Sequence, residues 1–213
     1  MPVVLLVRHG QASFGADDYD VLSDVGRRQS EVVGAELARR ALRSPVAVAG
    51  GLRRQQDTAA VALPGTPLLV DPPWDEYDHL VLLDRYPPTG SAEHADGSSR
   101  GLQVLLDDAL REWVDDPGGG WADFAGGATA ALAELVRDLR SGRDAVVFTS
   151  GGIVAAVCAG LLGVGAEGVV ALHRVTVNGG VTKLVVGRGG VSLVAFNDHA
   201  HFEGGARELL TYR

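Results

Sequence analysis

The chain has 213 residues, 46% of them hydrophobic and 22% charged, which is enough to bury a sizeable core in one domain or, less easily, in two small ones. Its formal net charge of −8 excludes a general electrostatic attraction to nucleic acid or to an anionic membrane surface. An anionic ligand would therefore have to be held by a local cluster of positive groups. The single cysteine, Cys158, excludes an internal disulfide and lies in an apolar run, which is typical of a buried thiol in a reducing cytoplasm.

The first third of the chain predicts strands that alternate with helices. Val3–Val7 is an uninterrupted apolar run and indicates a buried strand. Ser23 can cap a helix over residues 24–42, where apolar residues recur at helical spacing. A short strand at 46–49 leads through a glycine turn into a second helix within "GGLRRQQDTAAVAL", and a third strand is expected at 68–70.

The middle of the chain is less regular. Residues 71–127 are expected to form an insertion within a single domain that spans residues 1–213. The apolar side chains between 102 and 113 mark the buried face of a helix in this insertion. Clusters of proline and glycine at 87–101 and 117–120 favour an insertion over a second domain.

The last third returns to alternation and ends in a hairpin. A helix at 128–140 precedes a strand at 145–149, and a further helix follows at 153–162. Two strands at 181–186 and 191–196 flank "GRGG", which is a hairpin signal.

One segment raises the question of a membrane. Residues 145–166 carry no charge over 22 residues, which is long enough to cross a bilayer. Five glycines and the sequence "TSGG" divide the segment into a β-branched part and an alanine-rich part. We therefore expect a strand, a tight turn and a buried helix. The run at Val3–Val7 is too short for the core of a signal peptide, so no export signal is expected.

Apolar strands separated by helices predict a mostly parallel sheet that is covered on both faces. In such sheets ligands bind beyond the carboxyl ends of the strands. The residues that follow the first four strands are Arg8, His9 and Gly10; Arg53 and Arg54; Asp75, Glu76 and Asp78; and Ser150, Gly151 and Gly152. This set suits a phosphoryl group, because arginine matches phosphate oxygens in bidentate fashion and a helix N-terminus supplies free amides.

The segment "LLVRHGQAS" resembles the opening signature of the histidine phosphatase superfamily, also called phosphoglycerate mutase-like. The segments "LSDVGRRQ", "GLRRQQDTA", "WDEYDH" and "SLVAFNDHAHF" are similar to later parts of the family pattern and follow in the same order. The resemblance covers nearly the whole chain. It implies an α/β three-layer sandwich with a mostly parallel central sheet flanked by helices.

The resemblance also implies roles for individual residues. His9 would attack phosphorus and carry a transient phosphohistidine, while Arg8 and Arg54 would neutralise the phosphoryl oxygens. Glu76 would protonate the leaving oxygen, although the neighbouring Asp75 and Asp78 leave open which acid does so. No metal or other cofactor is expected, because the arginines neutralise the charge. Arg53, which precedes Arg54, is expected to be solvated.

Further contacts to phosphate are expected from Gln11 and Ser13, and from Ser150 and Gly151 at the start of the helix after the fourth strand. Ser150 stands where the family carries a second histidine. A hydroxyl can donate a hydrogen bond but carries no positive charge. The loss of one donor typically lowers a rate by about a hundred- to a thousand-fold.

A depleted site is our expectation. The alternative is that a histidine from another loop compensates, and the candidates are His79, His199 and His201. Substrate choice is expected to lie in the 71–127 insertion, whose aromatic side chains Trp74, Tyr77, Tyr86 and Trp113 would form the walls of the pocket.

The sequence thus predicts a phosphomonoester phosphatase that acts on a small phosphorylated metabolite. A catalytically weak protein of the same fold that binds a phosphometabolite is the alternative, and a phosphoglycerate mutase is ranked below both. The expected ligands are a small phosphorylated substrate or inorganic phosphate, with neither nucleic acid nor membrane as a partner. A homodimer is left open, and the expected location is cytoplasmic.

Overall fold

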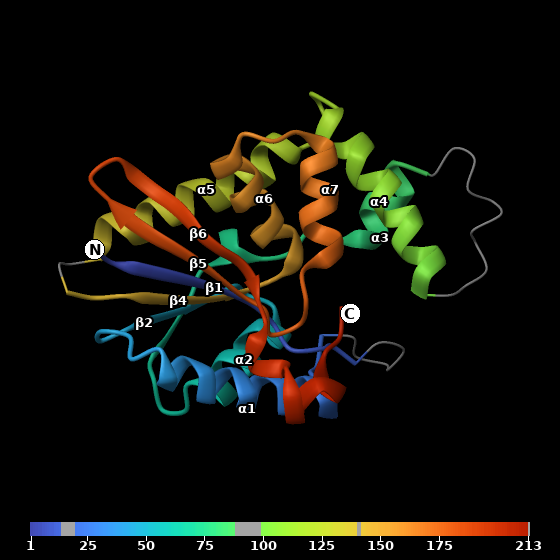
Figure 1. The fold of residues 1–213 in the computed structure, drawn as a ribbon. Helices are drawn as coiled ribbons and strands as arrows, with labels where there is room; N and C mark the ends of the chain where they lie inside the picture. The colour runs from blue at the N-terminus through green and yellow to red at the C-terminus, as the bar shows by residue number, and fades with distance from the viewer. Residues whose placement is uncertain (14–19, 88–98, 140–141, 213) are drawn as a thin grey trace.

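A computed structural model describes residues 1–13, 20–87, 99–139 and 142–212 (Figure 1). Its six-stranded sheet has the order β3-β2-β4-β1-β5-β6. The strands are β1 (Val3–Arg8), β2 (Val46–Ala49), β3 (Leu68–Val70), β4 (Ala145–Thr149), β5 (Val181–Gly187) and β6 (Gly190–Asp198). The helices are α1 (Asp24–Arg39), α2 (Arg53–Ala62), α3 (His79–Arg85), α4 (Ser99–Asp115), α5 (Trp121–Asp138), α6 (Gly151–Leu162) and α7 (Ala166–Val175), with 3-10 turns η1 (Pro72–Trp74), η2 (Ala200–Phe202) and η3 (Gly204–Leu209).

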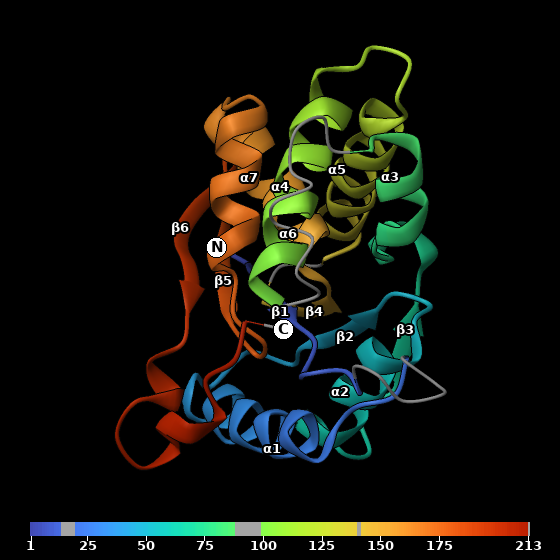
Figure 2. The ribbon, with the colours of Figure 1, turned by 90° about the vertical axis from the view of Figure 1, so that its right-hand side faces the viewer.

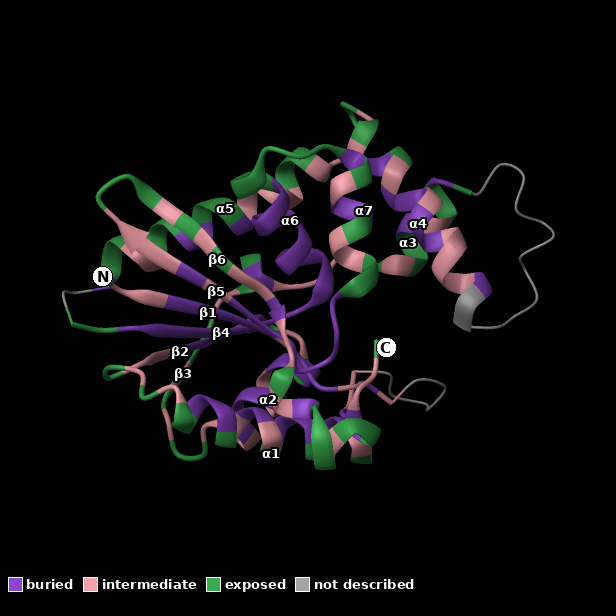
Figure 3. Ribbon diagram, in the orientation of Figure 1, coloured by how far each residue is buried: buried purple, intermediate pink, exposed green. Residues whose placement is uncertain are grey.

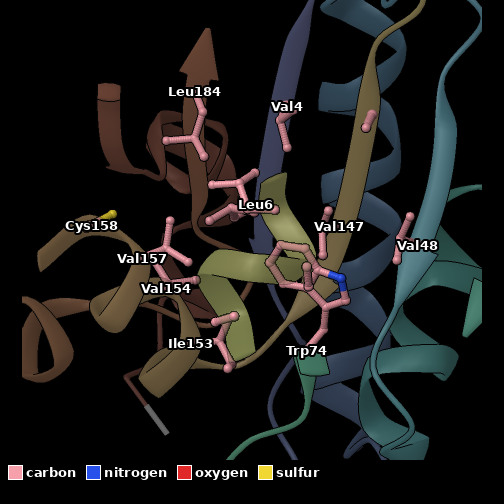
Figure 4. Packing of buried hydrophobic residues seen from close by; sticks show 14 of the residues in the cluster. Val4, Leu6, Val48, Trp74, Val147, Ile153, Val154, Val157, Cys158 and Leu184 are labelled. Carbon is pink, nitrogen blue, oxygen red and sulfur yellow. The ribbon is translucent and has the colours of Figure 1, made fainter. Parts of the chain in front are cut away.

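Strand β1 lies near the centre of the sheet because its side chains are apolar on both faces. Val4 and Leu6 join a core cluster on one face that includes Trp74, and Leu5 and Val7 join a second cluster on the other. Figure 4 shows the first cluster, in which Trp74 packs between the strands and helix α6. Strand β1 pairs in parallel with β4 and antiparallel with β5, so the sheet is mostly parallel with an antiparallel hairpin at one edge. The predicted α/β sandwich is confirmed.

Helices cover both faces of the sheet. Helices α5 and α6 pack on one face, and α1 and α2 cover the other together with η2 and η3 (Figure 1). The inner strands β1, β2 and β4 are largely buried between these layers, whereas the edge strands β3 and β6 and the outer faces of the helices are partly exposed (Figure 3). Helices α3, α4 and α7 lie beside one another beyond this sandwich (Figure 2).

Several predicted elements are confirmed. The strands at 46–49, 68–70 and 145–149 have the expected bounds. The uncharged segment 145–166 is a strand followed by a turn and the buried helix α6. Across the part of the chain that the structure describes, every helix is too short or too polar to cross a membrane.

Other elements differ from the prediction. Helix α5 begins at Trp121 rather than at residue 128, and Gly126 and Gly127 lie inside it. Its first turns are held by ring contacts of Trp121 and Phe124 with Trp113 at 5.1 and 5.4 Å, so tertiary packing outweighs the low helix propensity of glycine. Helices α3 and α7 were not predicted because both are short, and α7 contains Gly168.

A buried carboxylate holds the amino-terminal edges of the strands together. Asp144, which is 3% exposed, accepts hydrogen bonds from the Val3 amide at 2.8 Å and from the Arg43 amide at 2.8 Å. The Arg43 guanidinium lies 2.8 Å from the same carboxylate. Burial alone would raise the pKa of Asp144, but the hydrogen bonds from Arg43 and Val3 outweigh it and set the pKa at about 2.

We expect Asp144→Asn to lower the free energy of unfolding at pH 7 by on the order of 2 kcal/mol. The folded pKa is depressed, so this stabilisation is present above about pH 4, where the unfolded carboxyl ionises, and is lost as the pH falls through the folded value. Urea unfolding between pH 7 and pH 2 measures the effect. Glu208→Gln is the control, because its pair with Arg28 is more than half exposed and should change stability little. A difference between Asp144→Asn and wild type that stays constant down to pH 2 would contradict this account.

Candidate active site

A pocket of about 120 Å³ lies at the carboxyl ends of β1 and β4. Its walls come from β1, α2, α4, α7, the segment after η1 and the C-terminal segment. The lining residues are Arg8, His9, Ala12, Arg54, Glu76, Tyr77, His79, Leu102, Gln103, Leu106, His173, Asn178 and Tyr212. The pocket thus collects Arg8, His9, Arg54 and Glu76, which are four of the eight residues that the sequence assigned to a phosphate site.

The backbone around His9 is fixed on three sides. The His9 amide donates to the Thr149 carbonyl at 2.8 Å, which continues the pairing of β1 with β4. The Gly10 amide donates to the Thr58 hydroxyl at 3.0 Å. A Cβ atom on Gly10 would lie 2.4 Å from the Gly26 carbonyl oxygen, so only glycine fits at this position. The His9 side chain, 5% exposed, is therefore placed by rigid backbone.

Hydrogen bonds assign the tautomer of His9. Its Nδ1 lies 2.7 Å from the Gly10 carbonyl, which can only accept, so Nδ1 carries the proton. Nε2 accepts from Nε of Arg54 at 3.1 Å and therefore presents a lone pair. Burial, together with the charges of Arg54 and Arg8, lowers the pKa of His9 well below its ordinary value, although the bond to Gly10 opposes the shift. The imidazole is neutral at pH 7 and its Nε2 is a potential nucleophile.

Arg54 lies in the first turn of α2 and is 7% exposed. Its Nη1 is 2.6 Å from the Asp20 carboxylate, which also accepts from the Arg53 amide at 2.7 Å. Asp20 thus occupies the N-terminus of α2, where a negative charge is favoured, and orients the guanidinium. The Arg53 side chain is 61% exposed and lies 3.6 Å from Asp57, outside the pocket wall, in agreement with the prediction that it is solvated.

Arg8 enters the pocket from the last position of β1. Its Nη1 donates to the carbonyls of Thr176 and Tyr212, the latter at 2.9 Å. These two carbonyls belong to the residue after α7 and to the C-terminal segment, so two distant parts of the chain aim one guanidinium.

Glu76 meets the N-terminus of α6. Its Oε2 accepts from the Gly152 amide at 2.8 Å, and its Oε1 accepts from the Tyr77 amide at 3.3 Å. Burial raises the pKa of Glu76, while the Gly152 amide and the two pocket arginines oppose the shift. The adjacent acids lie elsewhere, since Asp75 accepts from the Gly51 amide and Asp78 caps α3. Among these three acids, Glu76 is the one that lines the pocket.

The structure places the other four predicted contacts outside the pocket wall. The Gln11 side chain accepts from the Ser23 hydroxyl at 2.9 Å and so supports the cap of α1. Ser13 pairs through its amide with the Val21 carbonyl. Ser150 is fully buried, and its hydroxyl accepts from Gln55 at 2.8 Å. The Ser150 hydroxyl is therefore engaged by a buried side chain rather than directed into the pocket. Gly151 is the first residue of helix α6.

The aromatic and histidine predictions are partly corrected. Of the four aromatic residues expected in the walls, Tyr77 lines the pocket, whereas the side chains of Trp74, Tyr86 and Trp113 are buried in core clusters. Two of the three candidate histidines lie outside the pocket wall, and each has a ring nitrogen within 3.0 Å of a backbone carbonyl; these are His199 and His201.

His79 does line the pocket, and so does His173, to which the sequence assigned no role. Asp20, Asn178 and Tyr212 were also missed. The Asn178 amide donates to the His9 carbonyl at 3.2 Å, and "VNGG" before β5 carried no signal of that contact. Only the return of distant segments to the end of β1 brings these residues to the site.

The arrangement can bind and transfer an anion. A neutral imidazole nitrogen, two guanidinium groups and a carboxyl group share one small pocket. Two arginines can neutralise a phosphoryl group, and a carboxyl group with a raised pKa can donate a proton near neutral pH. Within the described ranges, no group of three His, Cys, Asp or Glu side chains is placed to hold a metal ion.

The histidine phosphatase superfamily (branch 1) model matches residues 4–199. No curated protein gives a significant match. A mycobacterial glucosyl-3-phosphoglycerate phosphatase complexed with VO3 is 25% identical at a TM-score of 0.67, over 93% of this chain and 100% of that chain. A structure of that phosphatase with inorganic phosphate is 25% identical at a TM-score of 0.66, over 94% and 99%. A phosphoserine phosphatase mutant from Entamoeba histolytica is similar in fold, with 17% identity, a TM-score of 0.63 and coverage of 94% and 99%.

We expect Gly152→Ala to disable the site while the protein stays folded. A Cβ on Gly152 would lie 2.1 Å from Glu76 Oε1 and 2.5 Å from the Tyr77 ring, so both side chains must move. A displacement of about 1 Å in such a site can cost on the order of a hundred-fold in rate. The measurements are hydrolysis of p-nitrophenyl phosphate and circular dichroism. Gly160→Ala in the same helix is the control, since a Cβ there meets no atom within 4 Å. Wild-type turnover in Gly152→Ala would show that the contact with Glu76 is dispensable.

Proposed function

Because the chain belongs to the histidine phosphatase superfamily, we propose that it hydrolyses a small phosphomonoester through a phosphohistidine on His9. The observation that carries this proposal is the tautomer of His9. Its Nδ1 proton is held by the Gly10 carbonyl, and its Nε2 lone pair accepts from Nε of Arg54 within a pocket that also contains Arg8 and Glu76. A nucleophile, two cations and a proton donor are the parts that phosphoryl transfer by this route needs.

In the first step, Nε2 of His9 forms a bond to phosphorus as the bond from phosphorus to the ester oxygen breaks. Glu76 gives its proton to the departing oxygen, so the alcohol leaves neutral. Arg8 and Arg54 neutralise the charge on the non-bridging oxygens. The depressed pKa of His9 keeps the imidazole unprotonated and the raised pKa of Glu76 extends the range in which the carboxyl is protonated, so the two required states coexist.

In the second step, a water oxygen bonds to phosphorus and the bond to Nε2 breaks. Glu76, now a carboxylate, takes a proton from that water. Inorganic phosphate is released, and His9 and Glu76 return to their starting states. The overall reaction consumes one water and yields an alcohol and phosphate.

The comparisons support a phosphate-sized anion as the ligand. The similar mycobacterial phosphatase is described in complexes with inorganic phosphate and with VO3, and its structure covers nearly all of this chain. A cytoplasmic location belongs to the same proposal. Cys158 is buried, and burial raises the pKa of its thiol to about 12, so it is an inert core residue rather than half of a disulfide.

A second candidate is a protein of this fold that binds a phosphorylated metabolite without efficient turnover. The observation in its favour is Ser150, because the turn after β4 brings a buried hydroxyl instead of an imidazole. A phosphoglycerate mutase ranks below both, since it requires a persistent phosphohistidine and two well-held substrate positions.

We expect a labelled phosphoryl group to appear on His9 during turnover of a phosphomonoester. The adduct should be acid-labile and stable in base, as phosphorus bonded to imidazole nitrogen is. Rapid quench with labelled substrate measures it, and His9→Ala should abolish it. Label retained in His9→Ala would sink the assignment of the nucleophile. Vanadate binding without any label in the wild type would favour the binding protein instead.

We expect Arg54→Ala to weaken vanadate binding by about ten- to a hundred-fold, since a hydrogen bond to a charged group contributes about 1.5–3 kcal/mol. Arg53→Ala is the matched control from the adjacent position, because its side chain is largely exposed and should change affinity less than twofold. Titration calorimetry with vanadate measures both. Equal losses in the two variants would mean that the first turn of α2 presents a different arginine to the anion.

A further inference from the structure

His173 lies in the last turn of α7 and lines the same pocket as His9. His173 and Arg8 share a neighbour, Gly151. A Cβ on Gly151 would lie 3.6 Å from Cδ2 of His173, 3.6 Å from Nε of Arg8 and 3.7 Å from Cζ of Arg8. The imidazole edge and the guanidinium therefore both lie next to Gly151, on the side where a Cβ would project.

This is the turn at which the family resemblance expects a second imidazole, and the chain does not supply one from β4. Ser150 is fully buried against Gln55 and is not part of the pocket wall. The ring of His173 lies beside Gly151, the next residue of the turn. It comes from helix α7, which begins sixteen residues after Ser150. The turn is thus lined by an imidazole from α7 and a guanidinium from β1.

The His173 ring is held on a rigid support. Its Nε2 lies 3.2 Å from the Tyr77 hydroxyl, and the Tyr77 ring packs edge-on against Trp113 at 5.3 Å and Phe124 at 5.8 Å. Helix α7 packs against α4 and α6, and Arg174 donates to the buried Asp107 of α4 at 2.7 Å. An imidazole placed by a hydrogen bond and a packed helix is preorganised for a ligand.

The electrostatics of the position also favour an imidazole that binds an anion. Arg8 places a positive charge beside the same turn, next to the His173 ring. A phosphoryl group beside Arg8 would satisfy both side chains at once.

We propose that His173 binds the phosphoryl group together with Arg8 and takes the place of the histidine that Ser150 replaces. The inference rests on the proposed phosphatase function for its role in turnover, but its contribution to anion binding can be measured separately. The site is then compensated rather than depleted, through a histidine that comes from α7.

His173→Ala is the first test. We expect vanadate affinity to fall about tenfold and kcat/KM for p-nitrophenyl phosphate to fall about a hundred-fold, as for the loss of one charged donor. Free imidazole in the buffer should restore part of the turnover of His173→Ala. His173→Gln, which keeps an N–H donor without the charge, should retain more vanadate affinity than His173→Ala.

Three controls separate this role from its rivals. Tyr77→Phe removes the hydroxyl that contacts the His173 ring. If the role of His173 were purely structural, Tyr77→Phe and His173→Ala would both lower the melting temperature without changing vanadate affinity. His79→Ala tests the third histidine of the pocket wall, besides His9 and His173, and its turnover should not respond to imidazole. His199→Ala lies outside the pocket wall and should behave as wild type.

The inference is overturned if folded His173→Ala keeps vanadate affinity and turnover within twofold of wild type, or if His79→Ala alone collapses both. A wild type that binds vanadate but never labels His9 would defeat the proposed hydrolysis. The loss of vanadate affinity in His173→Ala would then still support the anion contact. A wild type that binds no vanadate would overturn both.

Discussion

The parallel pairing of β1 with β4 is the constraint on which the site depends. Carboxyl ends of adjacent parallel strands meet at one edge, so the residues after β1 and after β4 become neighbours although more than 130 positions separate them. The bond from the His9 amide to the Thr149 carbonyl extends that pairing into the site. Apolar side chains on both faces of β1 make the pairing rigid, because either face is covered by a packed core.

Burial then sets the chemistry of the groups that this edge collects. A buried histidine beside two arginines has its lowest free energy as a neutral imidazole. The hydrogen bond to the Gly10 carbonyl keeps the proton on Nδ1. The same burial acts in the opposite sense on Glu76 and favours its neutral acid form. One pocket therefore favours an unprotonated imidazole together with a protonated carboxyl group, a combination that solvated side chains of these types do not favour at the same pH.

Local sequence was sufficient wherever a residue's role depends on its own strand or helix. The apolar run before Arg8 and His9 predicted strand β1, and the short strands at 46–49 and 145–149 were found because β-branched runs have few alternatives in a buried sheet. Arg54 was distinguished from Arg53 by the family pattern, and its burial agrees with that choice. The start of α5 was missed, because aromatic packing against Trp113 of the preceding helix outweighs two glycines.

The sequence by itself determined which functional groups follow the first three strands. These are an Arg-His-Gly turn after the first strand, an arginine after the second and an acid after the third. What only the tertiary structure decided is which remaining polar groups reach the same point. Ser150 immediately follows β4 yet bonds to Gln55 inside the protein, whereas Tyr212 accepts a bond from Arg8 and His173 lines the same pocket, both from distant segments. Periodicity and capping describe interactions within a few residues. The direction of a polar side chain at a strand end depends instead on the hydrogen-bonding partner that the rest of the fold places beside it.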